Sequence, residues 1–124
     1  RANSVALQGN LACVLDSDIG FYILEISDPY NPTLLSTYQS AQSPGGIAVQ
    51  GRYAYLALNA PPTAITVAGT SLEVVDISNP GNPLLAGSTP LPSPPQIGDH
   101  ATRVTAFAVQ GNVALVGSSL TSGR

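Results

Sequence analysis

The single histidine of the chain is the first residue whose chemistry could support catalysis. His100 follows Asp99 in a proline-rich stretch. A histidine beside a carboxylate can orient a ligand or act as a base, but catalysis also requires a nucleophile or a substrate pocket around the pair. Nothing in the sequence marks such a group. A solvated loop histidine is therefore the favoured interpretation, with a functional histidine as the alternative.

Asp16-Ser17-Asp18 offers two carboxylates with the alternating spacing of calcium-binding loops. A complete calcium loop would continue with a glycine and a distal glutamate, and both are missing here. Aspartates at such positions commonly accept hydrogen bonds from the backbone two residues further on. The sequence therefore favours an Asx turn, and a calcium site remains the alternative.

Two further acidic residues occupy equivalent places before a proline turn. Glu25 and Asp76 each precede Ile-Ser, and they could in principle serve as acids at a site. Their repetition beside a turn favours hydrogen bonds to the backbone NH groups of that turn. Cys13 is the only cysteine and is expected to be a buried small hydrophobe rather than a reactive thiol.

The tyrosines could form an aromatic platform for a carbohydrate. Most of them fall in apolar runs that read as strands, where packing within the fold is the ordinary role of an aromatic ring. Packing is therefore favoured over sugar binding. The residues concerned are Tyr22, Tyr30, Tyr38, Tyr53 and Tyr55.

Composition predicts a folded all-β chain. Of 124 residues, 44% are hydrophobic and only 9% are charged, which is unlike a disordered segment. The 12 glycines and 11 prolines lie between short apolar runs, as expected for short strands joined by turns. With no lysine and a net charge of -3, nucleic acid is not an expected partner. No apolar run approaches the roughly 20 residues that span a bilayer, and no cofactor is indicated.

Three segments align as hairpins around a shared corner. Each has an apolar run, a Gln-Gly-Asn or Gln-Gly-Arg corner, and a second apolar run. The corner glycines Gly9, Gly51 and Gly111 are expected to supply the positive φ that a tight turn requires. The three segments are Ser4–Leu15, Gly46–Ala57 and Phe107–Gly117.

A second pair of segments aligns after the first two hairpins. Residues 21–36 and 71–86 each contain an apolar strand that runs into Ser-Asp-Pro or Ser-Asn-Pro and then Asn-Pro. Proline cannot donate to a ladder, so the strand must end there and turn. Each complete unit is therefore four antiparallel strands, which is the pattern of a β-propeller blade. A β-sandwich is the competing architecture, but it would not require the hairpins and proline turns to repeat in phase.

The most specific sequence motifs of the repeat are Val49-Gln-Gly-Arg-Tyr-Ala-Tyr-Leu-Ala57 and Leu72-Glu-Val-Val-Asp-Ile-Ser-Asn-Pro-Gly-Asn-Pro83. They closely resemble the LVIVD repeat, a propeller-type repeat of bacterial and archaeal proteins that are often exported. The resemblance is strongest in the second unit, weaker in the first, where Glu25 replaces the aspartate, and half represented in the third. It implies a propeller fold and export, and it carries no catalytic residues.

The second unit is longer than the first, with one insertion near 59–71 and another near 90–103. In a meander, alternate connections emerge at the same end of the sheet, so both insertions are expected on one face, as in the binding faces of repeat proteins. The alternative is that the insertions are surface loops that vary in length without a binding role. The candidate partner-contact residues are Asp16, Asp18, Pro61, Pro62, Ile65, Pro94, Pro95, Asp99, His100 and Arg103.

Together these observations predict a single β-propeller segment over residues 1–124. It has blades at about 4–38 and 46–88 and half a blade at about 104–118. The expected function is a noncatalytic structural or protein-binding module of a larger exported or surface-associated protein, located outside the cell, in the periplasm or at the cell surface. Either a longer chain or other protein chains would cover the open blade edges. The alternatives are a carbohydrate- or calcium-binding segment and a fragment of a propeller enzyme.

Overall fold

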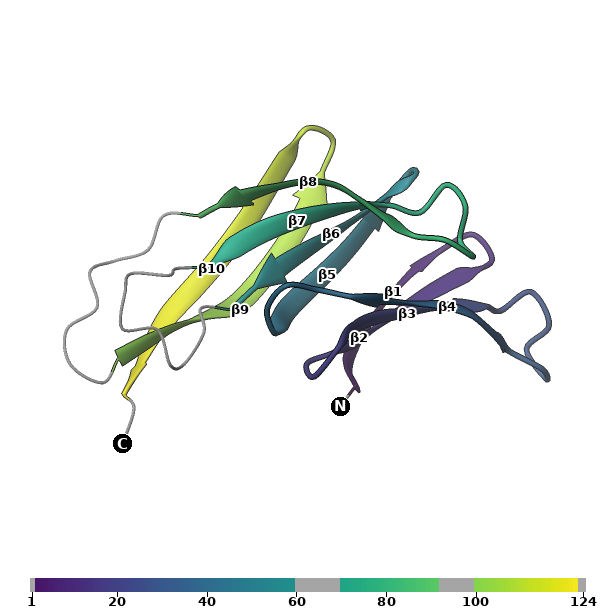
Figure 1. Cartoon of the computed structure of the whole chain (residues 1–124), viewed down its shortest axis with the longest axis horizontal. Coiled ribbons are helices and arrows are strands. Elements are labelled where there is room, and N and C mark those ends of the chain that lie inside the picture. The colour runs from purple at the N-terminus through teal and green to yellow at the C-terminus, as the bar shows by residue number, and fades with distance from the viewer. Residues whose placement is uncertain (1, 60–69, 92–99, 123–124) are drawn as a thin grey trace.

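The computed structural model describes residues 2–59, 70–91 and 100–122. Within them the chain forms ten strands and no helix (Figure 1). No helix in these residues is long and apolar enough to cross a membrane. The strands are β1 (Ala2–Gln8), β2 (Leu11–Asp16), β3 (Gly20–Glu25), β4 (Thr33–Gln39), β5 (Pro44–Gln50), β6 (Tyr53–Leu58), β7 (Ser71–Asp76), β8 (Leu84–Pro90), β9 (His100–Gln110) and β10 (Val113–Ser122).

The strands form three antiparallel sheets in chain order. Unit 1 is the sheet β1-β2-β3-β4, unit 2 is β5-β6-β7-β8, and unit 3 is the two-stranded sheet of β9 and β10. Every neighbour in a sheet is also a neighbour in sequence, which makes units 1 and 2 simple four-stranded meanders. The predicted all-β class and the propeller-blade architecture are confirmed, and the β-sandwich alternative is not what forms.

The corners form as their residue types require. Gly9, Gly51 and Gly111 adopt φ values of 58°, 63° and 59° between the two strands of each hairpin. A side chain at these positions would be strained, which explains why the same residue stands at all three corners. The proline turns also repeat, because the NH of Asn31 donates to the Asp28 carbonyl at 3.1 Å and that of Asn82 to the Asn79 carbonyl at 2.9 Å.

Unit 3 begins and ends differently from the sequence-based expectation. Its first strand starts at His100, so the backbone of His100 and Arg103 belongs to β9 and not to the preceding loop. Its second strand continues to Ser122. The ladder between them is regular apart from one irregularity at Gly117/Ser118. Period-2 alternation is weak in this stretch of small residues, which is why its ends were not apparent from the sequence.

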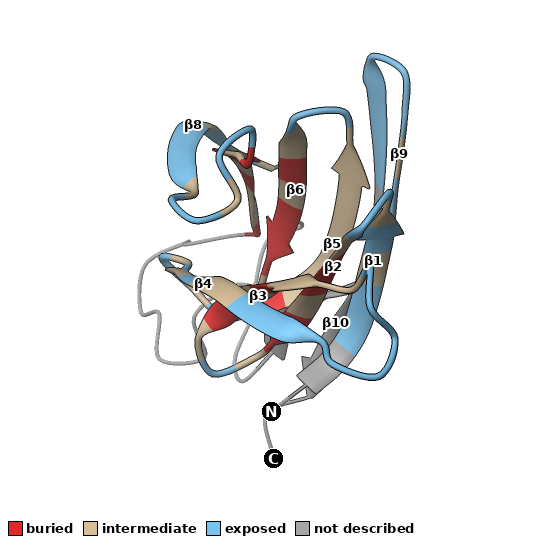
Figure 2. Ribbon diagram, turned by 90° about the vertical axis from the view of Figure 1, so that its right-hand side faces the viewer, coloured by how far each residue is buried: buried red, intermediate tan, exposed pale blue. Residues whose placement is uncertain are grey.

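The core of the molecule lies between units 1 and 2. Buried residues of β2 and β3 form one hydrophobic cluster with buried residues of β6 and β7. Figure 2 shows the buried stretches along β3 and β6 in red. Leu15, Phe21, Ile23, Leu56 and Val75 are each 0% exposed. Because these residues come from both sheets, neither unit completes its core without the other.

Candidate functional site

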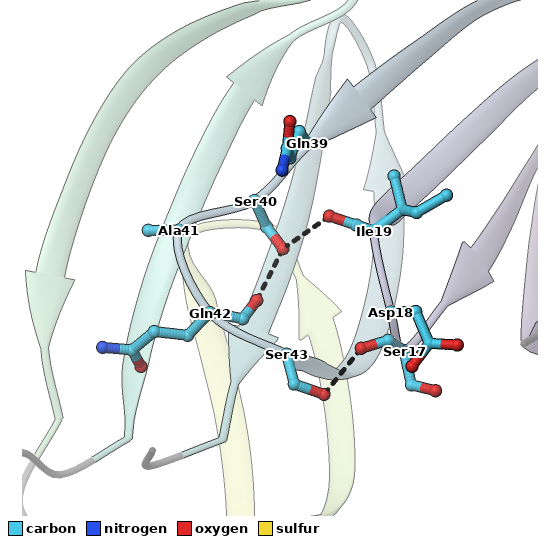
Figure 3. Close-up of a pocket in the computed structure, with 8 residues that line it drawn as sticks. All are labelled: Ser17, Asp18, Ile19, Gln39, Ser40, Ala41, Gln42 and Ser43. Carbon is cyan, nitrogen blue, oxygen red and sulfur yellow. Dashed lines mark hydrogen bonds between the residues drawn. The ribbon is translucent and has the colours of Figure 1, made fainter. Parts of the chain in front are cut away.

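Two connections of unit 1 lie together at one end of its sheet, which we call the insertion end. They are residues 17–19, between β2 and β3, and residues 40–43, between β4 and β5. The backbone NH of Ser40 donates to the Ile19 carbonyl at 2.9 Å. The Ser40 hydroxyl donates to the same carbonyl at 3.3 Å, and the Ser43 hydroxyl donates to the Ser17 carbonyl at 2.9 Å (Figure 3). The predicted sharing of one face by alternate connections is confirmed for this unit.

The residues that flank the two insertions of unit 2 meet at the same end. The NH of Asn59 donates to the Ser43 carbonyl at 2.8 Å, and the NH of Leu91 donates to the Thr70 carbonyl at 2.9 Å. The predicted contact residues within the insertions lie outside the described residues, and for His100 and Arg103 only the backbone is described. The predicted contact residues that lie outside the described residues are Pro61, Pro62, Ile65, Pro94, Pro95 and Asp99.

A shallow polar hollow of about 360 Å³ opens at the insertion end of unit 1. Two of its hydroxyl groups donate to backbone carbonyls, Ser40 Oγ to the Gln42 carbonyl at 2.6 Å and Ser43 Oγ to the Ser17 carbonyl at 2.9 Å. The Gln42 side chain points away from Asp18 and Ile19 (Figure 3). Among the described residues of the lining, Asp18 is the only ionisable group, and these residues include no second group that could pair with it in acid–base chemistry. The lining residues are Ser17, Asp18, Ile19, Gln39, Ser40, Ala41, Gln42 and Ser43.

Asp16 forms the Asx turn that the sequence favours. Its Oδ1 accepts the NH of Asp18 at 2.9 Å, and its Oδ2 accepts the hydroxyl of Tyr22 at 2.9 Å. Asp16 as a whole residue is only 7% exposed. Both of its oxygens are thus bonded to the protein itself. Among the described residues, no group of three or more His, Cys, Asp or Glu side chains is placed to hold a metal ion.

Glu25 and Asp76 also take the structural role expected of them. Glu25 Oε1 accepts the NH of Ser27 at 2.7 Å, and Asp76 Oδ1 accepts the NH of Ser78 at 2.9 Å. Asp76 has an additional partner, because Arg52 Nη2 lies 2.6 Å from its Oδ2. The Arg52 guanidinium and the hydrogen bonds from Ser78 lower the pKa of Asp76 to about 2.

Cys13 is buried, as predicted, with 1% of its surface exposed. Burial raises the pKa of its thiol to about 11, which keeps the thiol protonated and unreactive near neutral pH. Leu115, at the equivalent corner position of unit 3, is 67% exposed instead. The sequence pattern predicts an inward-facing side chain at both positions. Of the two, only Cys13 of unit 1 is covered by another sheet.

The tyrosines are dispersed rather than gathered on one platform. Tyr38 stacks on Phe21 with ring centroids 5.3 Å apart, and Tyr53 pairs with Tyr55 at 6.4 Å. Tyr30 is 96% exposed in the proline turn of unit 1. Four of the five tyrosines lie in strands, which agrees with the packing interpretation.

A recurring glutamine contact, which the sequence analysis did not find, joins consecutive units. Gln8 Nε2 donates to the Gly51 carbonyl at 2.5 Å, and the Gly51 NH donates to Gln8 Oε1 at 2.9 Å. Gln50 and Gly111 repeat the pair at 2.7 and 3.0 Å. We call this contact the glutamine clamp. Its signal was present in the sequence as the Gln before every corner glycine.

A buried glutamate between units 1 and 2 was also missed. Glu73 is 5% exposed, and its Oε1 accepts the hydroxyl of Tyr38 at 3.2 Å across the unit boundary. Burial, reinforced by the charge of Glu73, raises the pKa of Tyr38 to about 12. The pair is therefore a polar contact within the apolar boundary between units 1 and 2.

The comparison with protein families agrees with this repeating geometry. The LVIVD repeat model matches residues 1–40, 43–60 and 64–89, which is more than half of the chain. No curated protein and no solved structure gave a significant match. The matched segments contain the hairpin corners of units 1 and 2, both proline turns and the strands that follow them. The chain belongs to the LVIVD repeat family.

Proposed function

We propose that this chain is a noncatalytic structural and protein-binding module of a larger exported or surface-associated assembly. The observation that carries the proposal is the stacking of its units through apolar faces, together with similar faces left uncovered at both ends. Val5 and Leu7 of unit 1 are 56% and 65% exposed, and Val113 and Leu115 of unit 3 are 59% and 67% exposed. Such faces in repeat proteins are covered by further protein.

The absence of clustered reactive groups supports the noncatalytic part of the proposal for the described residues. The Asp16 carboxylate accepts hydrogen bonds from the Asp18 NH and the Tyr22 hydroxyl. Asp76 pairs with Arg52 and accepts a hydrogen bond within its turn, and Cys13 is buried. Family membership supports export, which cell fractionation would test. Recovery of the protein only from the cytoplasm would contradict it.

The binding role is tested by recovering the tagged protein from its source under native conditions and quantifying the proteins that come with it. Leu115→Glu places a charge on the uncovered face of unit 3, and Leu84→Glu makes the same change at a 58% exposed leucine on β8. We expect at least one stoichiometric partner, another copy of the chain included, with the wild type and Leu84→Glu but not with Leu115→Glu. A free monomer in all three preparations would contradict the proposal.

A further inference from the structure

Each boundary between units joins two different faces. The forward face of a unit consists of its corner glutamine and the side chains two and four residues after the corner glycine. The rear face is the corner glycine and the side chains two and four residues before it. At the boundary of units 1 and 2, Cys13 of the forward face belongs to the hydrophobic core cluster, and Leu11 of the forward face and Ile47 and Val49 of the rear face pack against that same cluster.

The same arrangement continues from unit 2 to unit 3. Gln50 of unit 2 clamps Gly111 of unit 3. Phe107, four residues before Gly111, lies so close to Gly46 of unit 2 that a Cβ added there would be 2.8 Å from the Phe107 Cβ. Strands β5 and β9 accordingly run beside one another (Figure 1). The boundary is therefore a recurring one with a fixed direction, forward face to rear face.

One forward face and one rear face remain uncovered. On unit 3, Ala108, Gln110, Val113 and Leu115 line an open hollow of about 290 Å³. Gln110 stands where Gln8 and Gln50 stand in the other units, yet its side chain has no hydrogen-bond partner among the described residues. Apolar side chains surround it, so a partner could bind there without dehydrating a charged group.

The uncovered rear face of unit 1 has the matching features. Val5 and Leu7 are four and two residues before Gly9, and both are more than half exposed. Gly9 has the same positive φ as Gly51 and Gly111. It is exposed, and no glutamine clamps it within the described part of the chain.

We propose that a second copy of this chain docks its unit 1 rear face on the unit 3 forward face, with Gln110 clamping Gly9 of that copy. The inference rests on the proposed function and names its partner. The contact repeats one that the chain already makes twice, with the same donor and acceptor atoms. Because the two faces differ, the association is head to tail, and it closes into a ring or extends as an open array according to the rotation between copies.

Complementation between two blocked variants tests this interface. Leu115→Glu blocks the forward face and Leu7→Glu blocks the rear face, and both residues are exposed, so neither change burdens the core. In sedimentation velocity and native mass spectrometry, the wild type should associate as its concentration rises, and each variant alone should stay monomeric. An equimolar mixture, with one variant isotopically labelled, should form a one-to-one dimer through the two intact faces.

The clamp itself has a matched pair of substitutions. Gln110→Ala should weaken association about tenfold while leaving the unfolding midpoint of the monomer unchanged, because two hydrogen bonds are lost only at the interface. Gln50→Ala should instead lower the unfolding midpoint, because its two hydrogen bonds lie within the chain. Equal effects of both substitutions on the monomer and none on association would overturn the assignment of Gln110.

The outcomes separate this inference from the proposed function. A wild type that stays monomeric at about 100 μM, or a mixture that fails to form the dimer, overturns docking of a second copy. If another protein is then lost with Leu115→Glu in the recovery experiment, the binding module stands with a different partner. If no protein is recovered either, both proposals fall.

Discussion

At the scale of single residues, three acidic groups of this chain, Asp16, Glu25 and Asp76, stabilise turns. The Glu25 and Asp76 carboxylates bind backbone NH groups just beyond their own strands, and Asp16 does the same at the insertion end. A carboxylate that accepts several hydrogen bonds favours its charged form, which lowers its pKa. The hydrogen bonds from Ser27 lower the pKa of Glu25 in this way. These carboxylates could act as acids or bases, but their oxygen atoms already accept hydrogen bonds within the fold.

The pH dependence of stability should reveal the Asp76 contact. Its pKa is lowered from 3.8 to about 2 in the folded chain, so its stabilisation is fully present above pH 3.8 and is lost as the pH falls through 2. Asp76→Asn should therefore lower the urea midpoint at neutral pH, and this difference from the wild type should shrink to nothing across that window.

Arg52→Gln provides the control for this titration, because Arg52 is the largest cause of the lowered pKa. In an Arg52→Gln background, the stability difference made by Asp76→Asn should lose much of its dependence on pH between 3.8 and 2, while Asp16, whose pKa is also lowered to about 2, titrates unchanged in both proteins. A difference between wild type and Asp76→Asn that persists below pH 2 would assign the effect to packing instead of charge.

At the scale of elements, the close approach of β5 and β9 depends on a residue without a side chain. Gly46 lies on β5 opposite Ala57, and a Cβ added to it would lie 2.8 Å from the Cβ and 3.5 Å from the ring of Phe107 on β9. A strand glycine often marks a place where another backbone comes near. The equivalent residue of unit 1 is Ser4, so the sequence repeat by itself does not indicate the need for glycine here.

Gly46→Ala should lower the free energy of unfolding by about 1–3 kcal/mol, because the added Cβ forces β9 away from β5. Gly87→Ala on β8 is the matched control, since a Cβ there would meet nothing within 4 Å. Its stability should equal or slightly exceed that of the wild type. Chemical denaturation of the three proteins measures both effects, and equal stabilities would refute the close contact.

At the scale of the whole molecule, units 1 and 2 share one core. Leu56 of β6 is fully buried in the same cluster as Cys13, Phe21 and Ile23 of unit 1. The buried Tyr38–Glu73 hydrogen bond crosses the same boundary. Because each sheet supplies one side of the core, we expect units 1 and 2 to unfold together.

Leu56→Ala should destabilise the chain by about 2–5 kcal/mol through the cavity it leaves. Leu84→Ala, at an exposed leucine of β8, should change stability by no more than about 0.5 kcal/mol. Hydrogen exchange should show that Leu56→Ala weakens amide protection in β2 and β3 as much as in β6 and β7. Loss of protection in unit 2 alone would mean that the units unfold independently.

The repeating elements of this protein follow from local sequence alone. Corner glycines require positive φ and prolines end strands, so Gly9, Gly51, Pro29 and Pro80 mark their turns through local backbone chemistry alone. The same local preferences predict the turn roles of Asp16 and Asp76. Such preferences act over a few residues and are therefore legible along the chain.

Only the tertiary structure decided which faces of the units meet. The glutamine clamp joins residues 43 and 61 positions apart, and the burial of Glu73 depends on a tyrosine 35 positions away. The exposure of Leu115, against the burial of Cys13 at the same repeat position, depends on whether another sheet covers it. Contacts between distant segments depend on the packing of sheets, and alternation within a strand cannot distinguish a covered apolar face from an uncovered one.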